Sequence, residues 1–243
     1  MILFIFTQIA LAESLFTNRL YELALTEYKR VFFFDSTAQR DLSLRLHYTI
    51  SALNTNFLKG YEEYDKLLKD FPDIGDESRI ILGRELIKNK HYSLAIDILR
   101  PTREKRLLGL CYLLNGQYYN ALDEFQNLDE EIALEVKEFL KKPKKSITCA
   151  MILSMFLPGW GEIYAGDFKR GLQDFIITSA SGLLLFKSFK DKKYVDAGII
   201  ISLLFNRFYF GSISNAGRIA QRNNERLEKD WLDYIKKKYS KDF

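Results

Sequence analysis

The sequence has few of the residue types that cross-link a fold or carry out chemistry. Its 243 residues include two cysteines, two histidines, four prolines and thirteen glycines. Cys111 and Cys149 lie in different surroundings and are expected to be unpaired buried thiols, so a disulfide framework or zinc site is not supported. The scarcity of proline and glycine favours long regular elements. A hydrophobic content of 47% argues against disorder.

Catalytic motifs are missing as well. His47 and His91 lie far apart, and neither is beside a nucleophile motif. The sequence contains no H-E-x-x-H, G-x-S-x-G or Walker loop. The carboxylates follow amphipathic patterns and are expected on solvated helix faces. The sequence therefore predicts no enzyme, no metal and no cofactor.

The charge is divided unevenly along the chain. Residues 1–140 hold 17 Lys and Arg against 22 Asp and Glu, whereas residues 141–243 hold 19 against 10. This asymmetry predicts two parts with different neighbours. The basic part also contains the apolar runs, which favours a lipid bilayer as its partner and not a nucleic acid.

The N-terminus begins with the apolar stretch MILFIFTQIALA. It ends in Ala10-Leu11-Ala12, a small-x-small site suited to signal peptidase, and is too short to span a bilayer. Residues 1–12 are therefore predicted to be a signal peptide, although no Lys or Arg precedes Arg19. The alternative is that residues 4–16 form the first helix of the folded domain, with Ala12 and Leu15 facing a partner helix.

An internal repeat occupies the acidic part. An aromatic residue is followed three positions later by a small residue and four positions after that by an aromatic residue or leucine. Such spacing places the three side chains on one helical face. The four sets are Tyr21-Ala24-Tyr28, Phe57-Gly60-Tyr64, Tyr92-Ala95-Leu99 and Tyr118-Ala121-Phe125, and each has an upstream partner pair: Ala12-Leu15, Tyr48-Ser51, Gly83-Leu86 and Gly109-Tyr112.

The last set, LGLCYLLNGQYYNALDEF, resembles the tetratricopeptide repeat (TPR). It carries L-G-x2-Y in Leu108, Gly109 and Tyr112, followed by the turn residue Gly116. The resemblance covers residues 13–140 and implies a short solenoid of antiparallel helix pairs. It further implies a binding scaffold whose groove holds a protein or peptide. The repeat residues themselves are expected to pack the core.

The basic part reads as a membrane domain. KKPKK at 141–145 is a basic hinge, and the uncharged run 146–156 is too short to cross a bilayer. Residues 171–189 and 194–211 are each long enough for a thin or tilted crossing, which predicts a helical hairpin within a membrane domain spanning 146–216. The charged tail 217–243 is expected to be helical.

Between these runs lies the stretch LPGWGEIYAGDFKRG, residues 157–171. It resembles the P-G-x-G-Q-x-Y-x-G-x-x-x-x-G motif of small bacterial membrane proteins, similar in style to the TM2-domain group, with Glu162 at the usual Gln position. Glycine permits tight reversal, and Trp and Tyr suit the headgroup zone. We expect an interfacial elbow; its motif residues are Pro158, Gly159, Trp160, Gly161, Tyr164, Gly166 and Gly171.

Two charged residues lie within the apolar runs. If the two crossings are antiparallel, Asp174 and Arg207 lie near the same membrane face and form an intramembrane pair. The alternative is that the two residues form no pair, because Asp174 lies at the membrane interface and the long Arg207 side chain extends to it.

Together these features predict an all-α protein: a TPR-like solenoid followed by a membrane-embedded hairpin. The predicted function is a protein-interaction scaffold at the bacterial cytoplasmic membrane, with the repeats on the periplasmic side. One alternative is a membrane-active protein whose hairpin forms homo-oligomers, binds lipid or aids insertion, with regulatory repeats. The other is a wholly soluble helical protein.

Overall fold

The structure is a computed structural model that describes the backbone of residues 2–239 and the side chains of residues 5–203 and 206–239. It is all-helical, with 83% of residues in helices. It divides into two compact units, Met1–Lys137 and Glu138–Phe243, called here the N-terminal and the C-terminal unit. The division falls inside helix α9, just before the predicted end of the repeat region at residue 140.

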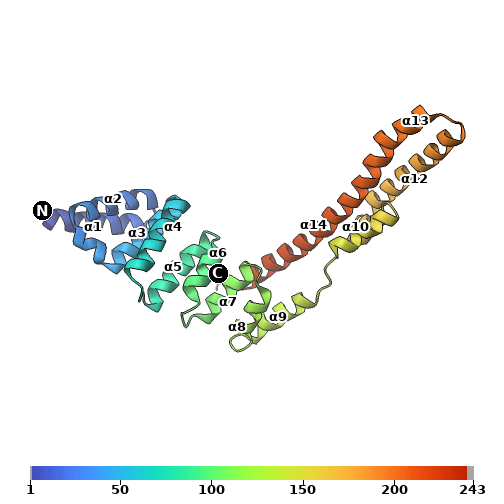
Figure 1. Cartoon of the computed structure of the whole chain (residues 1–243). Coiled ribbons are helices and arrows are strands. Elements are labelled where there is room, and N and C mark those ends of the chain that lie inside the picture. Colours follow the sequence, from blue (N-terminus) through green and yellow to red (C-terminus); the bar gives the residue numbers. More distant parts are fainter. Residues whose placement is uncertain (1, 240–243) are drawn as a thin grey trace. The chain divides into compact units, whose positions relative to one another are not determined.

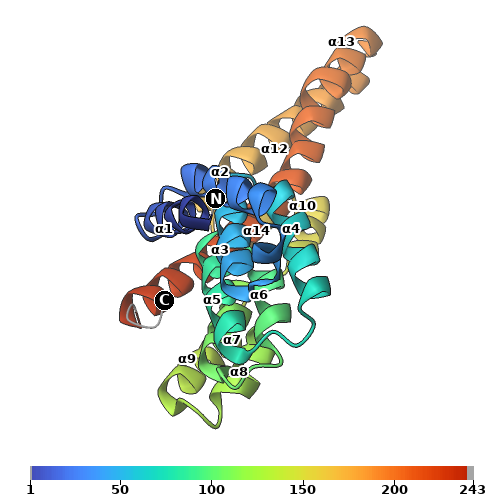
Figure 2. The ribbon, with the colours of Figure 1, turned by 90° about the vertical axis from the view of Figure 1, so that its left-hand side faces the viewer.

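The N-terminal unit is a succession of antiparallel helix pairs (Figures 1 and 2). The pairs are α1 with α2, α3 with α4, α5 with α6, and α7 with α8. Asp41 and Asn56 cap α3 and α4 by accepting hydrogen bonds from backbone N–H groups in their first turns. The helices are α1 Ile2–Thr17, α2 Tyr21–Phe34, η1 Ser36–Arg40, α3 Leu42–Thr55, α4 Phe57–Asp70, α5 Asp76–Lys88, α6 Tyr92–Leu99, α7 Lys105–Leu114, α8 Tyr118–Phe125 and α9 Glu130–Lys141.

The repeat residues lie where the helices of a pair meet. A Cβ atom on Gly83 would lie 2.7 Å from Leu99, and one on Gly109 would lie 2.7 Å from Phe125. Glycine at these points therefore sets how closely the two helices approach. Ala24, Tyr28, Ala95, Tyr112, Tyr118, Ala121 and Phe125 are buried, whereas Tyr21 and Tyr92, the first residues of α2 and α6, are only partly buried.

The first helix is built into this packing. Ala12 is fully buried against α2, and Leu15 packs on the same cluster. The Tyr28 hydroxyl donates to the Glu13 carboxylate at 2.7 Å, and His47 Nδ1 lies 3.0 Å from the same carboxylate. In the uncleaved chain, residues 4–16 are therefore part of the first helix of the domain, as the alternative to a signal peptide predicts. Cleavage after Ala12 remains a prediction.

The C-terminal unit contains a short bundle and a long hairpin. Its helices are α10 Ile147–Phe156, α11 Trp160–Ala165, α12 Phe168–Lys190, α13 Tyr194–Ile199, the π-helical stretch Ile200–Phe205 and α14 Asn206–Lys238. Helix α12 runs antiparallel to α13, the π-helical stretch and the start of α14 (Figures 1 and 2). Helices α10 and α11 pack on α14 at the base of the hairpin.

Two contacts join the first residues of this unit to α14. Lys145, the last residue of the predicted hinge, exchanges two hydrogen bonds of 2.8 Å with the Asn224 side chain. In the tail, the ring of Trp231 stacks on Phe139 with the ring centroids 4.1 Å apart. The tail is helical as predicted, and Trp231 gives it an aromatic contact within this unit.

One helix among the described residues is long and apolar enough, by length and composition, to cross a membrane: Tyr194–Lys238, which is continuous for 45 residues. Helix α12 has the length but does not meet the same criterion of mean hydropathy. The predicted boundary at residue 216 falls inside the long helix. No proline occurs between residues 194 and 238, so nothing in the sequence breaks the helix where its composition changes.

Candidate functional site

The elbow begins with a tight turn between α10 and α11. The Trp160 N–H donates to the Leu157 carbonyl at 3.0 Å, which closes a four-residue turn with Pro158 and Gly159 at its centre. Gly159 has φ = 93° and ψ = −24°. Proline followed by glycine with positive φ is the signature of a type II turn. The backbone reversal expected here from the glycines is therefore present.

A second left-handed glycine ends the short helix. Gly166 has φ = 109°, and its N–H donates to the Ile163 carbonyl. The Asp167 N–H reaches back to the Glu162 carbonyl at 2.8 Å, which completes a Schellman motif. The Asp167 side chain then caps α12 by accepting from the Arg170 N–H at 3.0 Å. The end of α11 and the start of α12 are therefore both fixed by hydrogen bonds at Gly166 and Asp167.

The remaining motif glycines let backbones touch. A Cβ atom on Gly159 would overlap the Gly171 carbonyl, and one on Gly171 would overlap the Gly159 carbonyl. A Cβ atom on Gly161 would overlap the Ala150 carbonyl of α10. These three glycines therefore lock α10, α11 and α12 together, and even alanine does not fit at these positions without a backbone shift.

Buried polar side chains follow the elbow through the base of the hairpin. Ser212 of α14, which is fully buried, accepts from the Gly159 N–H at 2.8 Å and donates to Glu162 Oε2 at 2.9 Å. Ser154 of α10 accepts from the Gly161 N–H at 3.1 Å. A nearby serine, Ser154, and a serine distant in sequence, Ser212, thus satisfy the backbone N–H groups that the turn leaves free.

Glu162 is fully buried. Besides Ser212, its carboxyl group has Asp174 of α12 as a neighbour. Two carboxylates have no proton to share, so Glu162 Oε1 has no donor unless one acid is protonated. Burial raises the pKa of Glu162 most, and the hydrogen bond with Asp174 raises it further. The Ser212 hydroxyl opposes these effects. The arrangement is a carboxylic acid held next to a carboxylate.

The two aromatic residues of the elbow differ in their surroundings. Trp160 is 51% exposed. Tyr164 is partly buried, and its hydroxyl accepts from the Ser146 N–H at 3.2 Å. The Lys145 ammonium lies 4.9 Å from the centre of the Tyr164 ring. Tyr164 therefore has a role inside the unit, whereas Trp160 is free to contact the surroundings.

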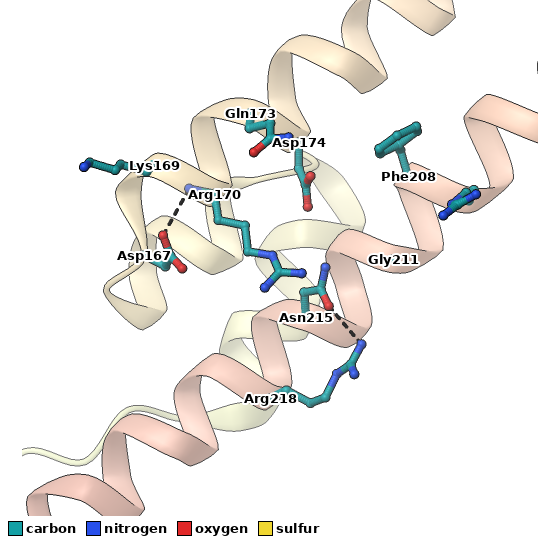
Figure 3. Close-up of a pocket in the computed structure, with 10 residues that line it drawn as sticks. Asp167, Lys169, Arg170, Gln173, Asp174, Phe208, Gly211, Asn215 and Arg218 are labelled. Carbon is teal, nitrogen blue, oxygen red and sulfur yellow. Dashed lines mark hydrogen bonds between the residues drawn. The ribbon is translucent and has the colours of Figure 1, made fainter.

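A polar groove opens beside the elbow, between the start of α12 and the start of α14 (Figure 3). Its volume is about 700 Å³. Asp174 and Arg207 both line it, but among the described residues no ion pair joins them, and Asp174 lies next to Glu162 instead. The lining residues are Asp167, Lys169, Arg170, Gln173, Asp174, Arg207, Phe208, Gly211, Asn215 and Arg218.

Helix α12 has its polar face inside and its apolar face outside. The buried residues Gly171, Asp174, Thr178 and Ser181 are spaced three and four apart and share one face. Leu183 and Phe186 are 72% and 71% exposed. Of the small residues 179–182 on this helix, only Ser181 is buried, and a Cβ on Gly182 would meet nothing within 4 Å.

The sequence did not predict the two serines that bind the turn, or the contact between Glu162 and Asp174. Ser212 and Ser154 were not expected to serve the turn, and Glu162 was noted only for its place in the motif. The available signal in the sequence was that Ser212 is a small polar residue next to an apolar run, which indicates a hydrogen-bonding role. The prediction that both thiols are buried is wrong for Cys149, which is exposed.

Comparison of the chain with models of known protein families, with curated proteins and with solved structures finds no match. Among the described residues, no group of three or more His, Cys, Asp and Glu side chains is placed to hold a metal. The functional argument therefore rests on the geometry of the two units.

Proposed function

We propose that the protein is a membrane-anchored interaction scaffold of the bacterial envelope. In this proposal the C-terminal unit inserts its hairpin into the cytoplasmic membrane, and the TPR-like N-terminal unit binds a protein or peptide on the periplasmic side. The elbow between α10 and α12 lies at the membrane interface. The protein has a binding and anchoring role without catalysis.

The observation that carries the proposal is the inverted polarity of α12. A helix in water buries its apolar face, but α12 buries Asp174, Thr178 and Ser181 and exposes Leu183 and Phe186. Val195 of α13 and Leu203 of the π-helical stretch, on the returning arm of the hairpin, are 76% and 63% exposed. Lipid is the surrounding in which apolar residues face out and polar residues face the helix partner.

Features of the elbow agree with an interfacial position. Its backbone N–H groups are satisfied by Ser154 and Ser212, as irregular backbone near a membrane requires. Trp160 is exposed beside the hairpin, where an indole suits the headgroup zone. The charged tip of the hairpin, residues 190–193, then lies at the opposite interface.

A groove in the N-terminal unit offers a place for the protein partner. It has a volume of about 550 Å³ and is lined by residues of α2, η1, α3 and α4. Phe33 at its edge is 82% exposed, which suits a partner with an apolar side chain. Arg45 is held in the groove by Asp70 at 3.2 Å and Glu63 at 3.4 Å.

Carbonate extraction of bacterial membranes tests the anchoring. We expect the full chain to stay in the membrane pellet and the double variant Leu183→Asp/Phe186→Asp to be released. The matched control is Leu58→Asp/Leu23→Asp. Leu58 of the N-terminal unit is 75% exposed, close to the value for Leu183, but lies outside the hairpin. The control should remain in the pellet.

Release of the unmodified chain by carbonate would contradict the proposal and favour the soluble alternative. Equal release of both double variants would show that exposed apolar residues in general, and not the hairpin, hold the protein on the membrane. The scaffold role is tested separately by Phe33→Asp. That variant should remain membrane-bound but lose a defined cross-linked partner that Tyr119→Asp retains.

The second candidate is the membrane-active role, in which the hairpin is the working part and the repeats regulate it. The polar groove at the base of the hairpin favours it, because a purely mechanical anchor needs no such feature. Expression of residues 138–243 alone distinguishes the two: activity or localisation in this unit alone supports the membrane-active role.

A further inference from the structure

We propose that the groove between α12 and α14 binds the phosphate headgroup of an anionic phospholipid. The inference rests on the proposed membrane insertion and adds a ligand to it. It makes the base of the hairpin a specific lipid site in addition to an anchor.

The charges of the groove fit a phosphate. Four basic side chains line it, Lys169, Arg170, Arg207 and Arg218, against the two acids Asp167 and Asp174. Within the described part of the chain, no carboxylate lies within ion-pair distance of the Arg170 or Arg207 guanidinium, although the charge of Arg170 acts on the buried Glu162 from further away. Guanidinium groups match phosphate oxygens with two parallel hydrogen bonds.

The groove also supplies neutral donors and a fixed geometry. Figure 3 shows Arg170 of α12 and Asn215 of α14 reaching toward each other from opposite walls, with Asp174 above them. Arg218 donates to Asn215 Oδ1 at 2.9 Å, which leaves the amide NH₂ of Asn215 available to an acceptor. The four basic side chains of the groove outnumber its two acids, of which Asp167 caps α12 and Asp174 lies next to Glu162.

The position of the groove selects a lipid over a phosphate taken from water. Leu172, Phe175 and Ile176 are exposed on α12 within the same turns as the groove, and Phe210 is 62% exposed on α14. A headgroup in the groove therefore places its acyl chains along the apolar outside of the hairpin. Basic pockets beside membrane helices bind anionic headgroups in this way.

The test uses the full chain in nonionic detergent, with phosphatidylglycerol as the probe and phosphatidylcholine of equal acyl chains as the neutral comparison. Lipid retained by the protein is measured by native mass spectrometry. We expect retention of phosphatidylglycerol over phosphatidylcholine. Arg170→Gln/Arg207→Gln should weaken this retention by about five-fold for each charge removed.

The matched control is Arg222→Gln/Arg226→Gln. These arginines are exposed on α14 outside the groove, so the control loses the same net charge. It should retain phosphatidylglycerol as the unmodified chain does. Thermal unfolding of all three proteins by circular dichroism should agree, because the substituted side chains are exposed.

Three results would overturn the inference: equal retention of the two lipids, equal loss in the groove and control variants, or displacement of the lipid by millimolar inorganic phosphate. The last would assign the groove to free phosphate. Failure of the proposed function is distinguishable, since it shows as release of the unmodified chain by carbonate. Lipid indifference in a chain that resists carbonate refutes the lipid site alone.

Discussion

Glu162 of α11 and Asp174 of α12 lie next to each other inside the C-terminal unit, with Glu162 fully buried and Asp174 nearly so. Two adjacent acids out of water cannot both ionise without a large cost. The pair therefore keeps one proton. It joins the elbow to the helix that leaves it, and Ser212 extends the contact to α14.

This pair predicts that the protein loses stability as pH rises. The folded state raises the pKa of Glu162 from 4.5 to about 8, first through burial. Over that interval the folded state holds more protons than the unfolded state, so the free energy of unfolding falls as the pH rises. Glu162→Gln should remove the fall, because an amide donates to Asp174 at every pH.

Thermal unfolding in detergent at pH 5 and pH 9 measures the effect by circular dichroism. The control is Glu225→Gln on α14, an exposed carboxyl whose substitution should leave the pH dependence as it is in the unmodified chain. Parallel pH profiles for the unmodified chain and Glu162→Gln would rule out the shared proton.

The elbow glycines should be intolerant of any side chain. Gly159→Val and Gly161→Val are expected to damage membrane assembly, and Gly161→Ala should already cost about 1–3 kcal/mol by overlap with the Ala150 carbonyl. Gly182→Ala and Gly211→Ala are the controls, because a Cβ there meets nothing within 4 Å. Both should be neutral or slightly stabilising, since alanine favours a helix. Yield in the membrane fraction and melting temperature are the measurements.

Ala121 should reject a larger side chain. It lies on α8 and is fully buried, so Ala121→Leu is expected to overpack the pair of α7 and α8 and to lower the free energy of unfolding by about 1–3 kcal/mol. Tyr119→Leu, two residues away and 73% exposed in the native protein, should have little effect. Urea unfolding of a fragment of residues 1–140 checks both. An unchanged midpoint for Ala121→Leu would mean that the repeat alignment is misplaced.

Ala12 should behave as a core residue in the unprocessed chain. Ala12→Leu is expected to cost about 1–3 kcal/mol, whereas Ala10→Leu, an exposed position on the same helix, should cost little. Urea unfolding of protein purified without export measures the difference, and equal midpoints would place α1 outside the core. Intact mass from bacterial envelopes tests processing separately. A chain beginning at Glu13 would confirm the signal peptide.

Local patterns in the sequence determined a large part of this protein. Spacings of three and four placed Ala24, Tyr28 and Ala121 on buried helix faces, because a helix repeats every 3.6 residues wherever it lies. Proline and glycine at 158 and 159 predicted a turn, because their backbone preferences are intrinsic. A scarcity of proline predicted long helices, although not that Tyr194–Lys238 would be one of them.

Only the tertiary structure decided which distant residues meet. Ser212 and Glu162 lie 50 positions apart, and nothing in either local pattern indicates their hydrogen bond. The same holds for Gly159 against Gly171, and for the groove that joins Arg170 to Arg218. Such contacts depend on how whole helices pack. The polar side of α12 became its buried side because α11, α13, the π-helical stretch and α14 pack on that helix, and the helix period alone does not say which face a neighbour takes.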